Sequence, residues 1–157
     1  MSLFEDNRYQ YRDTFFIFFP KQNRPSTQRV LDALKSLGAK YEIQNARESD
    51  TGFESVSVIS PHDCSAMDIA YEASDEVKAQ IRDLLEEFRT LTLRGDDAEK
   101  LQRLQKFDAR FDIFHFERVV DNSEDEALDP GGLLMVMQTL TELVDGIGLD
   151  PQSQALM

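Results

Sequence analysis

The chain has 157 residues, of which 41% are hydrophobic and 30% charged, a composition typical of one globular domain with its own core. Its formal net charge of -13 would repel phosphate backbones and anionic membranes, so we expect no nucleic acid and no membrane among its partners. The single cysteine, Cys64, excludes a disulfide framework and favours a reducing compartment, so we expect a cytoplasmic protein.

The segment Thr14–Phe19 is the most informative part of the chain, because its last five residues are all apolar. A half-exposed strand alternates apolar and polar residues, so this run predicts a strand over 11–19 that is covered on both faces. Apolar surface contributes ~25 cal/mol per Å² when it is buried, and exposed phenylalanines would forfeit that contribution. We therefore expect the last helix or a second subunit, in a homodimer, to cover the second face.

A helix is predicted from Pro25 to Leu37. Proline suits the first helical turn, and Asn23 or Ser26 can cap the free amide groups there. Gly38 ends the helix, as glycine commonly does. The apolar stripe at helical spacing consists of Val30, Leu31, Leu34 and Leu37.

A hairpin follows this helix. Residues 39–44 alternate polar and apolar side chains, which is typical of a half-exposed strand at a sheet edge. Turn residues at Asp50–Gly52 connect it to a second strand over 53–60. We expect residues 61–73 to form a loop.

A long helix is predicted after Ser74, which can cap it, and its apolar stripe runs from Val77 to Leu91. Gly95 ends this helix, and a short second helix follows it. The next segment, over 110–119, is an aromatic strand with the sequence Phe111-Asp112-Ile113-Phe114-His115-Phe116.

The C-terminal part is predicted as a helix behind an acidic linker. Residues 121–129 contain five acidic and no basic side chains, which favours a solvated linker. Asp129-Pro130 then opens an apolar helix, which Gly146 ends. We describe the chain as a single domain, 1–157, with a core over 10–120, the linker, and a C-terminal helical extension over 130–157.

The order strand, helix, strand, strand, helix, strand is the ferredoxin-like βαββαβ pattern. We therefore expect an α+β fold with an antiparallel sheet and an additional C-terminal helix. Right-handed crossovers give the strand order 4-1-3-2. This order makes the first strand central and the second an edge, in agreement with the aromatic run and the polar face.

The predicted ligand site lies on the second face of the sheet. If the phenylalanines at 114 and 116 face the helices, the residues between them face the other way. Small hydroxyl groups beside an aromatic strand can leave a pocket with a few polar groups, as ligand sites require. The residues expected there are Ser55, Ser57, His115 and Glu117. The alternative, which we favour for His115, is a hydrogen-bonded core histidine.

The segment His62-Asp63-Cys64 holds reactive side chains next to one another. Such groups can ligate metals or form a nucleophile, but adjacent side chains do not converge in the manner of a Cys-His dyad. No second metal-binding pair is present in the sequence, and the backbones of His62 and His115 are expected ~10 Å apart. We expect an ordinary loop here, with no metal and no cofactor.

Three functions are compatible with these features. We expect a non-enzymatic intracellular binding or regulatory module, which holds a small molecule or a protein partner on the second sheet face. One alternative is an acidic inhibitor or immunity-type protein that neutralises a basic partner, as the net charge suggests. The other is a small enzyme that uses His115 or His62, which would need a deep pocket and a second titratable group beside the histidine.

Overall fold

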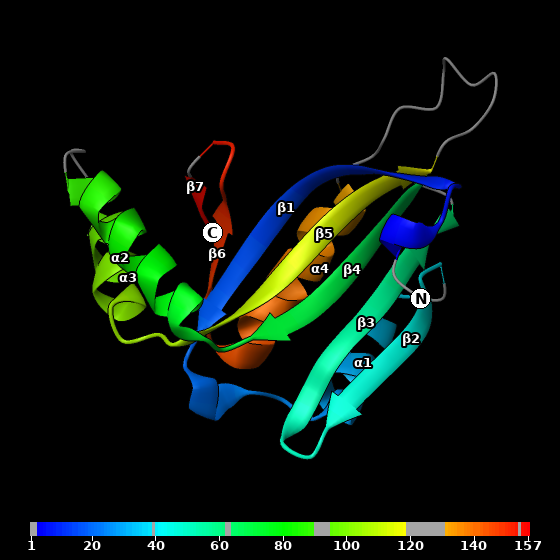
Figure 1. Cartoon of the computed structure of the whole chain (residues 1–157), viewed down its shortest axis with the longest axis horizontal. Helices are drawn as coiled ribbons and strands as arrows, with labels where there is room; N and C mark the ends of the chain where they lie inside the picture. Colours follow the sequence, from blue (N-terminus) through cyan, green and yellow to red (C-terminus); the bar gives the residue numbers. More distant parts are fainter. Residues whose placement is uncertain (1–2, 39, 62–63, 90–94, 119–130, 154) are drawn as a thin grey trace.

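The computed structural model describes residues 3–38, 40–61, 64–89, 95–118, 131–153 and 155–157. These residues form an α+β fold around one seven-stranded antiparallel sheet (Figure 1). The strands are β1 (Tyr9–Phe19), β2 (Glu42–Ser49), β3 (Gly52–Ser60), β4 (Ser65–Glu72), β5 (Ala109–Arg118), β6 (Ile147–Asp150) and β7 (Ala155–Leu156). The helices are α1 (Thr27–Lys35), α2 (Asp75–Arg89), α3 (Gly95–Leu104) and α4 (Gly131–Val144), with short 3₁₀ turns η1 (Leu3–Glu5) and η2 (Lys21–Asn23). None of these helices has the length and apolar character that a membrane span requires.

The strand order is β2-β3-β4-β5-β1-β6-β7. As predicted, β1 lies inside the sheet and β2 lies at an edge. The ferredoxin-like order 4-1-3-2 is wrong, because β1 pairs with β5 and β6 and not with β3. The difference is due to β4, which replaces the loop expected over 61–73 and lies between β3 and β5.

The strand β4 has a readable but weak sequence signal. Met67, Ile69 and Tyr71 alternate along it and share one face. The alanines at 66 and 70 obscure this alternation, because alanine is depleted in strands and favours helices. The strands β2, β3 and β4 are therefore consecutive both in the chain and in the sheet, and each pair is joined by a hairpin. The helices α2 and α3 then connect β4 to β5.

The first face of the sheet is covered by α1 and α4, which contact each other and lie behind the sheet in Figure 1. Apolar residues of both helices pack there against the middle of the sheet. The buried residues of β1 and β5 in this core are Phe15, Ile17, Phe19, Ala109, Phe111 and Ile113. Those of the two helices are Val30, Leu34, Leu133, Val136, Met137, Leu140 and Val144.

The second face is covered by α2 and α3, but only beside β1, β6 and β7 (Figure 1). Phe18 is fully buried against these helices, and Phe16 packs at the edge of the same cluster. The segment Phe15–Phe19 of β1 is therefore covered on both faces within one chain, whereas residues 10–12 of the same strand are exposed. Our expectation that the last helix covers the second face is wrong, because α4 joins α1 on the first face. A homodimer is not needed to cover Phe15–Phe19.

The helix caps agree in part with the sequence. The Ser26 hydroxyl accepts a hydrogen bond from the Arg29 amide at 3.2 Å and caps α1, whereas the Asn23 side chain donates to the Val144 carbonyl. The helix α2 begins after Ser74, but the buried Ser74 hydroxyl has no hydrogen-bond partner among the described residues, which include the first turn of α2, so its side chain does not act as a cap. The predicted acidic linker lies outside the described residues.

Candidate functional site

The structure divides the four predicted site residues between the two faces of the sheet. Cross-strand pairing places Ser57, Asp68 and Phe114 side by side in neighbouring strands, and therefore on the second face. It places His115 beside Met67, on the first face. The assumption that Phe114 faces α1 and α4 is wrong. The odd-numbered residues of β5, among them Ala109, Phe111 and Ile113, face those helices, whereas the even-numbered set combines Phe114 and Phe116 with Arg110, Asp112 and Arg118.

His115 is a buried side chain with two hydrogen bonds. It is 2% exposed, with Nδ1 at 3.0 Å from Asp13 Oδ1 and Nε2 at 3.0 Å from Ser65 Oγ. Burial lowers the pKa of His115, and the Asp13 carboxylate opposes that shift. A neutral ring satisfies both contacts when Nδ1 donates to Asp13 and the Ser65 hydroxyl donates to Nε2. Glu117, on the same face, forms an ion pair with Arg12 at 2.9 Å.

Asp13, His115 and Ser65 are hydrogen-bonded in the same succession as the carboxylate, imidazole and hydroxyl of a catalytic triad. The geometry nevertheless does not support catalysis. Ser65 is 2% exposed, and its hydroxyl is bound to the ring on the first face. The nearby cavity of ≈230 Å³ is bordered by Ser65 as well as by second-face residues such as Gln44 and Ile59. The three residues instead join β1, β5 and β4 through a polar contact inside the core.

A groove of ≈250 Å³ on the second face contains the other two predicted residues, Ser55 and Ser57. It lies over β3, β4 and β5 and is bounded by the N-terminal turn η1. Phe4, Ala70 and Phe114 border it on this face, whereas Val56 and Ile69, which also line the groove, belong to the core of the first face. Its polar wall is formed by Asn45, Arg47, Ser55, Ser57 and Asp68.

The carboxylate of Asp68 is held in place at the floor of the groove. Its Oδ1 accepts a hydrogen bond from the Ser57 hydroxyl at 2.6 Å, and its Oδ2 accepts one from the Leu3 amide at 3.0 Å. The second bond fixes η1 over the sheet, where Leu3 is buried among apolar residues of β3, β4 and β5. The sequence analysis did not select Asp68, because it lies in the segment that we expected to be a loop.

Arg47 brings a guanidinium to the rim of this groove. The register of β2 shifts between Gln44 and Arg47, and Asn45 adopts a left-handed backbone with φ 55°. Such bulges re-aim side chains and are common beside functional sites. Arg47 is exposed and forms no hydrogen bond or ion pair with the described part of the chain. Arg47 is therefore the one cationic group among the described residues that border the groove.

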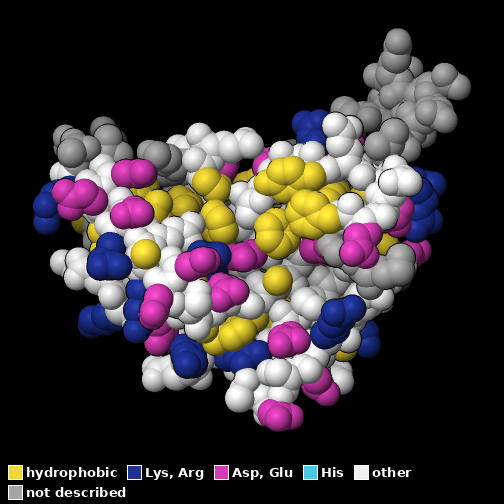
Figure 2. Space-filling view, viewed as in Figure 1, with side chains coloured by type: hydrophobic (Ala, Val, Ile, Leu, Met, Phe, Trp, Pro, Cys, Tyr) yellow, Lys and Arg dark blue, Asp and Glu magenta, His cyan; other side chains and the backbone are white. Residues whose placement is uncertain are grey.

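An aromatic cluster borders the groove. The ring of Phe4 lies 5.3 Å from that of Phe114, 4.8 Å from that of Phe116 and 5.6 Å from that of Tyr11, between centroids. Phe4 is 56% exposed and Tyr11 45%. Figure 2 shows hydrophobic side chains gathered on this face, over β1 and β5. Exposed aromatic groups beside a polar-lined groove are typical of a binding surface.

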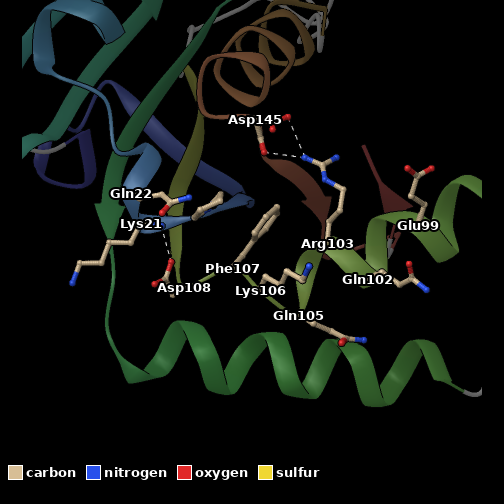
Figure 3. A pocket seen from close by; sticks show the side chains of 11 residues that line it. Lys21, Gln22, Glu99, Gln102, Arg103, Gln105, Lys106, Phe107, Asp108 and Asp145 are labelled. Carbon is tan, nitrogen blue, oxygen red and sulfur yellow. Dashed lines mark hydrogen bonds and ion pairs between the residues drawn. The ribbon is translucent and has the colours of Figure 1, made fainter.

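A wider cleft of ≈1210 Å³ lies at the opposite end of the strands (Figure 3). Its walls are the segment Pro20–Gln22 after β1, the second half of α3 with the turn that follows it, and Asp145 after α4. No sequence motif marks this cleft, because its residues come from three distant segments.

Metal chemistry has no candidate in the described residues, where no group of three or more His, Cys, Asp or Glu side chains could hold an ion. His62 and Asp63 lie outside the described residues. Cys64 is partly buried and has a left-handed backbone with φ 51°. The suggestion of a reactive cluster at 62–64 therefore stays untested.

Comparison with protein-family models, with curated proteins and with solved structures found no significant match. The function therefore has to be argued from the geometry of the chain itself.

Proposed function

We propose that this protein is a non-enzymatic binding module that holds a small aromatic carboxylic acid in the groove on the second face. The observation that carries the proposal is the guanidinium of Arg47 at the rim, which has no partner in the part of the chain that the structure describes and lies opposite the rings of Phe4 and Phe114. A guanidinium binds a carboxylate through two parallel hydrogen bonds, and these are stronger than hydrogen bonds between neutral groups.

The shape of the groove supports a small, flat ligand. Its volume of ≈250 Å³ is below the ~300–1,000 Å³ of most small-molecule sites, so a compound with one ring fits better than a large cofactor. The rings of Phe4 and Phe114 offer an apolar surface to the ligand ring. Asp68, which accepts hydrogen bonds from the Ser57 hydroxyl and the Leu3 amide, gives the floor of the groove a fixed carboxylate.

The chemistry of the lining favours binding over catalysis. Among the described residues that border the groove there is no histidine, cysteine or lysine to act as a base or nucleophile near neutral pH. The charge distribution gives the acidic-inhibitor alternative little support on the face drawn in Figure 2, where acidic and basic side chains are interspersed.

A thermal-shift screen of small aromatic carboxylic acids, with benzoate and its hydroxylated derivatives as probes, tests the proposal. We expect at least one acid to raise the melting temperature of the wild-type protein and not that of Arg47→Ala. Arg29→Ala is the matched control, because Arg29 is an exposed arginine of α1, on the first face. If no acid binds, or if Arg47→Ala binds as well as the control, the proposal is wrong.

A further inference from the structure

We propose that the N-terminal turn η1 is a lid on the groove of the second face, and that a bound ligand favours its closed position. This inference rests on the proposed function, because it concerns the same groove. The turn lies in front of the sheet in Figure 1, as the dark-blue segment above the N label, and it contacts β1 and β4. The structure shows the closed position, in which Phe4 borders the groove.

Leu3 holds the turn in this position through its side chain and its amide. The side chain is 6% exposed and packs in a small apolar cluster with buried residues of β3, β4 and β5. The amide donates a hydrogen bond to Asp68 Oδ2 at 3.0 Å. The described residues that border the groove do not include Leu3, so it is a positioning residue for Phe4.

The turn is attached to the sheet by fewer buried groups than the core strands are. It has three residues, and Phe4 at its centre is 56% exposed. Asn7 and Arg8, which lie between the turn and β1, are exposed as well. Segments with few buried apolar contacts open at a lower free energy than the whole domain unfolds. We therefore expect η1 to leave the sheet while the sheet stays folded.

The closed position completes the ligand site. The ring of Phe4 then lies 5.3 Å from that of Phe114, between centroids, and both rings border the groove. Opening would remove the Phe4 ring and the hydrogen bond from Leu3 to Asp68, whose carboxylate would then repel an anionic ligand more strongly. A ligand that binds the closed form better shifts the equilibrium toward that form, and closing raises the affinity for the ligand by the same factor.

Amide hydrogen exchange of the wild-type chain, measured by NMR, tests the lid. The probe is whichever acid among benzoate and its hydroxylated derivatives gives the largest thermal shift. Without it, the Leu3 amide should exchange at least about tenfold faster than the amides of the central strand β5. With the acid at about ten times its Kd, exchange at Leu3 should slow about tenfold. The control is the Met157 amide, which donates to the Gly148 carbonyl at 2.8 Å at the opposite edge of the sheet and should not be slowed.

A leucine variant tests the same coupling from the side of the lid. Leu3→Ala should weaken binding of the acid by about tenfold or more, because the apparent affinity falls with the fraction of closed chains. Leu3→Met keeps a large apolar side chain and should bind the acid as the wild type does. Leu84→Ala is the matched control, because Leu84 is a buried leucine of α2, 8% exposed, in the cluster under α2 and α3. It should change the affinity by less than about twofold, and thermal melts establish that all variants are folded.

The outcomes separate the lid from the proposed function. If no acid raises the melting temperature of the wild-type chain, the proposed function is wrong and the lid fails with it. If an acid binds but Leu3→Ala binds it as tightly as the wild type does, or if the acid does not slow exchange at Leu3, only the lid is wrong. Exchange at Leu3 as slow as that in β5 would also overturn the lid, because the turn would then open only when the whole domain unfolds.

Discussion

At the scale of single residues, His115 shows how burial changes the properties of a titratable group. Its ring is bound between Asp13 and Ser65 inside the core, and burial lowers its pKa below the usual value of about 6.5. The unfolded chain therefore binds a proton at a pH at which the folded chain does not. As the pH falls below about 6.5, this difference destabilises the folded state.

We predict that His115→Phe lowers the free energy of unfolding by about 1–3 kcal/mol at neutral pH, because Asp13 and Ser65 lose their partner. The difference between the two proteins should shrink near pH 5.5, because only the wild type loses the contribution of a neutral histidine. Denaturant melts of both proteins at two pH values measure this. Other carboxylates titrate in both proteins and cancel in the difference. An equal pH dependence of the two proteins would contradict the prediction.

At the scale of elements, the turn between α4 and β6 packs directly on β1. A Cβ atom at Gly146 would lie 2.5 Å from the Phe18 carbonyl oxygen, whereas one at Gly148 would meet the flexible end of Met137 at 3.3 Å. The sequence analysis assigned Gly146 only to ending the helix. The structure adds a second requirement, which is the close approach of two backbones.

We predict that Gly146→Ala lowers the free energy of unfolding by about 2–4 kcal/mol, because the backbone of β1 or of the turn must move. Gly148→Ala, two residues further on in β6, is the matched control, and it should cost less than about 1.5 kcal/mol, because a methionine side chain can adjust. Urea denaturation of the two variants gives the comparison. Equal losses would show that the turn can shift away from β1.

At the scale of the whole molecule, the helix α4 closes the first face. Five of its apolar residues are buried in the same core as Phe15, Ile17 and Phe19 of β1. The same helix exposes Leu134 and Met135, which are 51% and 44% exposed. The effect on stability of losing the buried residues of α4 can therefore be compared with the effect of changing its exposed residues.

We predict that a chain ending at residue 118 loses its cooperative unfolding transition, because the aromatic residues of β1 would lie in water. The double variant Leu134→Gln/Met135→Gln should keep the stability of the wild type within about 0.5 kcal/mol, as exposed positions usually do. Thermal melts and size-exclusion chromatography measure both. A truncated chain that remains monomeric and equally stable would show that α4 is not needed to cover β1.

The sequence by itself determined the type of most elements, because apolar periodicity is a local property. The aromatic runs of β1 and β5, the edge position of β2 and the stripes of α1 and α2 were all predictable in this way. The burial of Phe15–Phe19 on both faces of β1 followed from the uninterrupted apolar run of these five residues.

Only the tertiary structure decided how these elements combine. The strand β4 reordered the sheet, and the register of β5 placed His115 and Ser57 on opposite faces. Both alternating sets of β5 contain aromatic residues, Phe111 in one and Phe114 with Phe116 in the other, and the pairing with β1 and β4 fixes which set faces α1 and α4. The groove beside Arg47 and the cleft beside Lys106 likewise arise where distant segments meet, and no single segment of the chain contains either of them.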